Sequence, residues 1–225
     1  MLKKIITTLV AAVAVALPAH SDPLRESDYF TNHSMGCMLL RECTDYVKEV
    51  RNISDISSEI PNVNYDHITD EFNSLVRSLR QIGVGVFLAD QRYFPTGHRG
   101  VYHTVGNNFF LNKAFMHRPG VMMAVSRHEG WHAAQDCMAG GIDNSLIAII
   151  MDEDKVPSMY QEIVKKTYAF QPAAIPWEKE AYWAGHTENM TANALASCSA
   201  GTMYSDYEPT PMTREWLVEN GHLPK

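Results

Sequence analysis

The sequence predicts an α+β fold that is mostly helical and contains a small sheet. Three observations support this class. Apolar residues recur at helical spacing in several segments, most clearly over residues 68–82. Residues 84–89 form a short apolar run between Gly83 and Asp90, as expected for a strand. Residues 101–112 have a second extended pattern, just before a long helical segment.

Composition limits the classes of function. The chain has 225 residues, of which 45% are hydrophobic, so it can bury a core in one domain or in one domain of two lobes. Its formal charge is -7, and loss of Lys3 and Lys4 with an export signal would make it -9. An acidic chain without a basic run lacks the electrostatic footprint for binding nucleic acid or anionic lipid.

The first residues have the pattern of a secretory signal. Two lysines precede an apolar run over residues 5–17, and small residues then allow cleavage after Ala19 or Ser21. The run is too short to span a bilayer comfortably. We therefore expect a signal peptide over residues 1–21 and a mature domain over 22–225. The mature protein would be secreted or periplasmic, without a stable membrane anchor.

The first half of the chain is expected to form two helices and one strand. The spacing predicts a helix over residues 35–50 and a loop over the Ser-, Asn- and Pro-rich residues 52–64. The helix over residues 68–82 should end at Gly83, and the strand over residues 84–89 follows it.

The second half begins with the turn region 91–100 and the extended segment 101–112, where Gly106 suggests a bulge. Pro119 and Gly120 should open a helix that runs to about Met138. Three further helices are expected after it, and a helical turn follows the last of them. Their predicted positions are residues 145–151 capped by Asp143, residues 159–168 capped by Ser158 with Gln161, residues 177–196, and residues 214–219.

The four cysteines form an even set in a chain bound for an oxidising compartment, which predicts one or two disulfides. Three pairings are possible, and the sequence does not choose among them. No pair has the CxxC spacing of a zinc knuckle. The residues are Cys37, Cys43, Cys137 and Cys198.

The segment HEGWH carries the candidate chemistry. His128 and His132 are four residues apart, so on a helix their imidazoles project from one face and can bind one Zn²⁺. Glu129 would then lie beside the metal and act as a base toward a water molecule. The alternative is structural, because two buried histidines satisfied by hydrogen bonds would give the same pattern.

A third ligand is expected from the helix that begins near Trp177. Glu178 and Glu180 both lie near its start, and residues two apart point to different faces. We favour Glu178, because its face continues through Ala181 and Gly185, which allow a close approach to the histidine helix. Glu180 is the alternative, and either carboxylate could simply be solvated at a helix N-terminus.

HEGWH followed by EKEA resembles the gluzincin branch of zinc metallopeptidases, over residues 101–186. The resemblance implies a zincin-like fold in which HExxH gives two ligands and the base, and a later glutamate completes the site. Several gluzincins read E-x-E-A-D on the later helix, which places the ligand at Glu178. Tyr182 occupies the aspartate position here. The metzincin continuation HxxGxxH is absent after His132.

The resemblance also implies a sheet edge beside the active helix, which would bind an extended peptide by strand addition. The segment 101–112 would supply this strand, although an ordinary core strand is equally compatible with the pattern. Zincins also need a donor for the oxyanion, commonly Tyr or His. Four residues qualify and are not ranked by the sequence: Tyr182, His186, Tyr168 and His103.

We therefore expect an exported zinc metallopeptidase that acts on a peptide or protein substrate. Two alternatives stay open. One is a disulfide-stapled binding protein that contains zinc without turnover. The other is a zinc hydrolase that acts on a non-peptide amide, such as cell-wall material. The sequence does not predict the oligomeric state.

Overall fold

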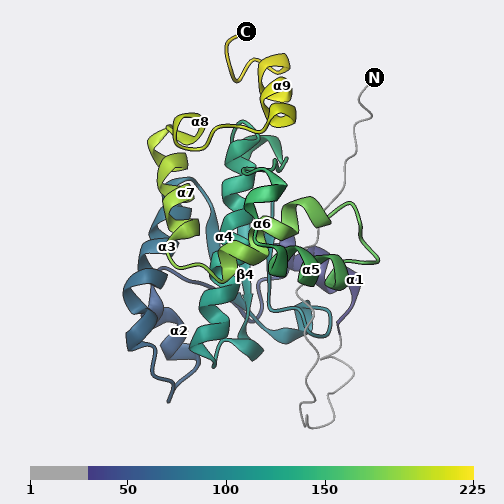
Figure 1. Ribbon diagram of the computed structural model, residues 1–225. Coiled ribbons are helices and arrows are strands. Elements are labelled where there is room, and N and C mark those ends of the chain that lie inside the picture. Colours follow the sequence, from purple (N-terminus) through teal and green to yellow (C-terminus); the bar gives the residue numbers. More distant parts are fainter. Residues whose placement is uncertain (1–29) are drawn as a thin grey trace.

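A computed structural model describes residues 30–225 (Figure 1). The signal peptide expected over residues 1–21 lies outside the described residues. The helices are α1 (Asn32–Leu39), α2 (Ile53–Glu59), α3 (Thr69–Gln81), α4 (Pro119–Met138), α5 (Ser158–Thr167), α6 (Ile175–Gly185), α7 (Met190–Ala200), α8 (Met203–Asp206) and α9 (Pro211–Glu219). The strands are β1 (Val47–Glu49), β2 (Gly85–Ala89), β3 (Gly100–His103) and β4 (Asn108–Asn112).

The four strands form one sheet in the order β1-β2-β4-β3. β1 and β2 are antiparallel, β2 and β4 are parallel, and β3 and β4 form an antiparallel hairpin. β3 therefore lies at an edge of the sheet and precedes α4 in the chain. The α+β class with a small sheet is confirmed.

Alternation of side chains along the strands divides the core into two layers, because successive strand residues point to opposite faces. One face packs with α3, α4 and α7 in the main core. Its sheet residues are Val86, Leu88, Tyr102, Phe109 and Leu111. The other face packs with Met35 and Met38 of α1. Its sheet residues are Phe87, Ala89, Val101 and Phe110. The sheet thus lies between α1 and the bundle that contains α4.

Helix α4 passes through the middle of the molecule (Figure 1). It has Pro at its first position, where the missing N–H costs nothing, and it ends before Gly140 and Gly141, whose φ angles are 108° and 133°. Its predicted bounds are confirmed. Most of its residues are buried, since β3, β4, α3, α6 and α7 all pack against it.

Helix α6 packs closely against α4 and runs antiparallel to it. At one end, the backbone carbonyl of Trp177 accepts a hydrogen bond from Gln135. At the other end, a Cβ at Gly185 would lie 2.9 Å from the carbonyl oxygen of Ala124 and 3.3 Å from the Cβ of His128. The close approach expected from the small residues of α6 is therefore present.

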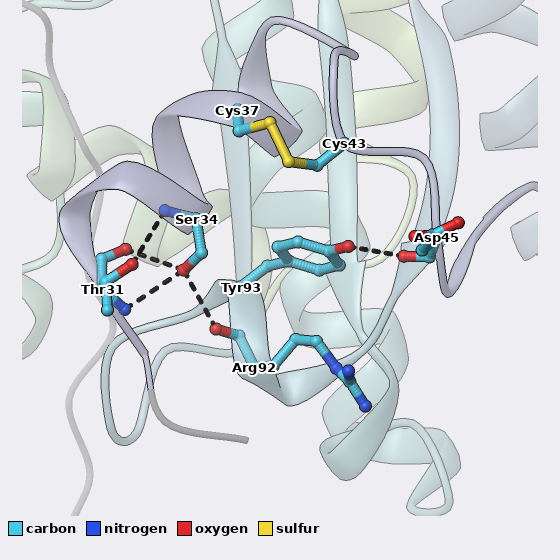
Figure 2. The surroundings of a disulfide bond; sticks show 7 residues. All are labelled: Thr31, Ser34, Cys37, Cys43, Asp45, Arg92 and Tyr93. Carbon is cyan, nitrogen blue, oxygen red and sulfur yellow. Dashed lines mark hydrogen bonds between the residues drawn. A yellow bond between two sulfur atoms is a disulfide. The ribbon is translucent and has the colours of Figure 1, made fainter. Parts of the chain in front are cut away.

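Helix α1 lies on the outer face of the sheet, and a disulfide joins it to the loop that follows it (Figure 2). Cys37 and Cys43 form a disulfide, and Thr31 caps the helix through a hydrogen bond from the backbone N–H of Ser34. Nearby, the Tyr93 hydroxyl donates to the carbonyl oxygen of Asp45 at 2.6 Å. The disulfide closes a short loop after α1, and the Tyr93 hydrogen bond attaches the chain before β1 to the segment that follows β2.

The helix predicted over residues 35–50 is wrong beyond Leu39. Arg41 and Tyr46 have positive φ angles of 59° and 60°, which a helix does not allow, and β1 begins at Val47. The loop predicted over residues 52–64 is also wrong in part. It contains α2, because Asn52 and Asp55 form a reciprocal capping box that starts a helix there.

Four other expectations need correction. Residues 101–112 form two strands of a hairpin, with Gly106 in the connecting turn and Asn107 at a φ of 49°. Residues 145–151 are not helical, and Ser145 is left-handed at a φ of 58°. Helix α5 has no side-chain cap. The helix predicted over 177–196 is two helices, separated where Asn189 adopts a φ of 62°.

All four cysteines are paired, because Cys137 at the end of α4 forms a second disulfide with Cys198 of α7. Two disulfides are the chemistry of an oxidising, extracellular environment. Across residues 30–225, none of the helices has the length and apolar character needed to cross a bilayer.

Candidate metal centre

Helices α4 and α6 bring three metal-binding side chains together. His128, His132 and Glu178 each offer a ligand atom, and these atoms all lie within 4.8 Å of one another. The Nε2 of His128 is 3.3 Å from one Glu178 oxygen, and the Nε2 of His132 is 3.6 Å from the other. All three side chains are buried. The arrangement forms a His-His-Glu group that could hold a metal ion.

The atoms that face this centre lack ordinary partners. The two Nε2 atoms and both Glu178 oxygens are buried, and none accepts or donates a hydrogen bond of standard geometry within residues 30–225. Buried polar groups are normally satisfied, so four such atoms around one point require an explanation. A divalent cation would supply it, since imidazole and carboxylate groups are ligands of such ions, and the donor set fits Zn²⁺.

The other ring nitrogens are held by hydrogen bonds that turn each Nε2 toward the centre. His132 Nδ1 is 2.8 Å from Gln135 Oε1, and since that oxygen can only accept, the imidazole donates from Nδ1. His128 bonds to the backbone of Ala181. Such contacts fix the tautomer and the orientation of metal-binding histidines.

The two glutamates of α6 have different surroundings. Glu180 accepts hydrogen bonds from Trp131 Nε1, from Gln135 Nε2 and from the backbone N–H groups of Ile150 and Met151. Its carboxylate is fully used in joining α4 and α6 to the segment after α4. Glu178 instead faces the histidines. Burial alone would raise the pKa of Glu178, but the charge of His132 and the contact with His128 outweigh it and lower that pKa.

Glu129 lies next to the centre on the side of the sheet. One of its oxygens accepts a hydrogen bond from the backbone N–H of Tyr102 in β3, at 2.9 Å. Burial raises the pKa of Glu129 to about 7, with the nearby charge of Glu178 adding to the rise and His128 opposing it. A divalent cation at the centre would lower this pKa through its charge. A carboxylate that can exchange a proton near neutral pH suits a general base.

The four candidate oxyanion donors lie in different places. Tyr168, which follows α5, is buried, and its hydroxyl lies close enough to the Glu178 carboxylate to lower the pKa of Glu178. Tyr182 and His186 stack on each other and pack beside Tyr160. His103 lies at the end of β3, where it bonds to the backbone of Leu39. Of these four, Tyr168 is the one that acts on the pKa of Glu178.

Two contributors to the centre were not assigned from the sequence. Gln135 supports His132 by a hydrogen bond and is itself fixed by Glu180. The sequence could have indicated this role, because Gln135 comes three residues after His132 and lies on the same face of the helix. The side chain of Tyr102 donates to Asp136 at 2.8 Å, so β3 is attached to α4 at two points.

The chain has no match among protein-family models, curated proteins or solved structures. The resemblance to gluzincins therefore has no support from relatives, and the zincin-like fold has none from a structural neighbour.

Proposed function

We propose that this protein is an exported zinc-dependent metallopeptidase. The observation that carries the proposal is the buried His128, His132 and Glu178 group, whose facing atoms have no hydrogen-bond partners of standard geometry, with the carboxylate of Glu129 adjacent. Catalytic zinc sites use three protein ligands and structural sites use four, and this group offers three.

The chain supplies the remaining parts of a hydrolytic site. Bound Zn²⁺ would act as a Lewis acid toward the carbonyl and would make a water molecule more acidic. Glu129 takes the proton of the attacking water and transfers it to the leaving nitrogen. Tyr168 donates a hydrogen bond to the carbonyl oxygen as negative charge develops on it. The edge strand β3 positions Glu129 through the hydrogen bond from the backbone N–H of Tyr102.

One observation favours a second candidate. His128, His132 and Glu178 are at most 3% exposed, and a closed site is typical of a structural metal. On this alternative the protein contains zinc and binds a partner without turnover. A third candidate keeps the hydrolytic chemistry and exchanges the peptide for another amide, such as cell-wall material.

The deciding experiment measures zinc content and cleavage of a broad peptide library. We expect one zinc per chain and cleavage that a chelator abolishes. Glu129→Gln should retain zinc and lose at least about a hundredfold in rate, the usual contribution of a positioned base. The control variant is Glu188→Gln, which changes an exposed glutamate.

Other outcomes select among the candidates. Stoichiometric zinc without cleavage of any peptide, in either the wild type or the control, would favour the binding protein. Cleavage of a cell-wall polymer, sensitive to chelator and absent with peptides, would favour the third candidate. A protein that binds no zinc at all would remove all three.

A further inference from the structure

Two arginines near the start of β3 share one aromatic ring and have no acidic partner. Arg99 directly precedes β3, and Arg118 is the N-cap residue of α4. Their guanidinium carbons each lie 5.7 Å from the centroid of the Phe115 ring. The charged or titratable groups that act on Arg99 are Arg118 and Tyr182. Within residues 30–225 neither arginine forms an ion pair.

This arrangement leaves hydrogen-bonding capacity of both arginines unused. The Nε atoms of both arginines are buried and have no hydrogen-bond partner in the described part of the chain. Burial, with the like charge of Arg118, lowers the pKa of Arg99. Both side chains are partly buried, and stacking on Phe115 leaves these two Nε–H groups without an acceptor. A carboxylate would satisfy them, since its two oxygens match the fork of a guanidinium.

The pair lies at one end of the candidate metal centre. Gly100 follows Arg99, and a Cβ at Gly100 would lie 3.2 Å from the Cγ of Glu129. Arg99 is therefore one residue from the part of β3 that contacts the proposed base. On α6, Tyr182 comes one turn after Glu178, and it interacts electrostatically with Arg99. Because α6 is antiparallel to α4, this turn leads from the centre toward the N-terminus of α4.

We infer that Arg99 and Arg118 form a subsite for a carboxylate of the substrate, at the end of the metal centre nearest the N-terminus of α4. This inference rests on the proposed function and names its substrate class: peptides that carry a negative charge close to the scissile amide. The carboxylate belongs to an acidic side chain or to a free C-terminus. The free N–H groups in the first turn of α4 add positive potential at the same end.

The negative charge of the protein disfavours non-specific binding of anionic peptides. A chain with a formal charge of -7 repels anions in general, so a preference for a carboxylate has to come from a local group. Arg77 offers a matched control, because it is an exposed arginine on α3, away from this end of α4. Thermal unfolding followed by circular dichroism would show that each variant is folded.

The experiment measures peptide binding by calorimetry to the full chain in the Glu129→Gln background, which prevents cleavage. Three probes are compared: acetyl-Ala-Ala-Ala with a free carboxylate, the C-terminal amide of the same peptide, and acetyl-Ala-Glu-Ala amide. We expect at least one carboxylate probe to bind about tenfold more tightly than the neutral amide, as a charged hydrogen-bonded pair provides. The tighter of the two carboxylate probes identifies the source of the charge.

The variants decide the assignment. Arg99→Gln and Arg118→Gln should each remove most of the preference, Arg99→Lys should keep part of it, and Arg77→Gln should keep all of it. Equal binding of the charged and neutral probes by the parent protein would overturn the subsite. So would an equal loss in the Arg77 and Arg99 variants. The measurement is repeated with chelator, so that failure of zinc binding, which concerns the proposed function, is separated from failure of the subsite.

Discussion

Glu178 and Glu180 lie two positions apart on α6, and both carboxylates are buried, but Glu180 meets hydrogen-bond donors whereas Glu178 meets the Nε2 atoms of two histidines. Glu180 receives hydrogen bonds from two side chains and two backbone N–H groups. Glu178 faces two imidazole nitrogens that have no hydrogen-bond partner of standard geometry in residues 30–225. One residue therefore belongs to the structure of the protein, and the other is available to a cation.

The first prediction compares Glu178→Gln with Glu180→Gln. We expect the Glu178 variant to lose zinc while its free energy of unfolding, measured without metal, changes little. The Glu180 variant should lose about 1–3 kcal/mol of stability, because its new NH₂ group would face donors. Zinc content by atomic absorption and urea unfolding with chelator make the comparison. Zinc loss confined to the Glu180 variant would reverse the ligand assignment.

The second prediction concerns Gln135, which connects His132 to Glu180. Gln135→Leu removes the acceptor that holds Nδ1 of His132, so we expect zinc affinity to fall about 10- to 100-fold, the usual effect of losing such a support. Competition with a chromogenic chelator measures the affinity. An exposed helical residue, changed as Ser58→Leu, should leave it unaltered. Equal affinities in the two variants would show that Gln135 does not orient the imidazole.

Several parts of this site could be predicted from the sequence, because they depend on local spacing. The bounds of α4 follow from Pro119 and the glycine pair after Met138. The shared face of His128 and His132 follows from helical geometry. The small residues on one face of α6 favoured Glu178, and the structure brings that residue to the histidines.

Other features of the fold and the site depend on tertiary contacts, which the spacing of residues in the sequence does not reveal. Residues 186–189 are His-Thr-Glu-Asn and contain neither proline nor glycine, so the break between α6 and α7 was missed. The two extended segments at 101–103 and 108–112 differ in the sheet only through their pairing, which makes β3 the edge and β4 central. The meeting of Arg99 with Arg118 over Phe115 joins the start of β3 to the start of α4, and no motif indicates it.

The third prediction tests the close contact between α4 and α6. In Gly185→Ala the new methyl group would lie 2.9 Å from the carbonyl oxygen of Ala124, so the two helices must separate. We expect a loss of about 1–3 kcal/mol and weaker zinc binding, because Glu178 moves with α6. Gly36→Ala is the control, since a Cβ there meets nothing within 4 Å and alanine favours a helix. Urea unfolding with and without zinc measures both effects, and unchanged zinc affinity in the Gly185 variant would contradict the coupling.

The fourth prediction is a dependence of stability on pH that comes from Asp136. This residue is 0% exposed, and burial raises its pKa to about 8, although the hydrogen bond from the Tyr102 hydroxyl opposes the rise. Between the ordinary value near 4 and about 8, the folded protein keeps a proton that the unfolded chain has released. The folded state binds more protons in this window, so stability should fall as pH rises through it.

The slope attributable to Asp136 should approach about 1.4 kcal/mol per pH unit, the limit for one proton. Asp136→Asn has no proton to release, so its free energy of unfolding should depend less on pH by that amount. Urea unfolding of the metal-free protein at several values between pH 5 and 7.5 measures the difference, and other titrating groups cancel between the two proteins. Asp66→Asn, at an exposed position, should follow the wild type. Parallel curves for the wild type and the Asp136 variant would mean that this carboxyl is ionised in the folded protein, held by groups other than Tyr102.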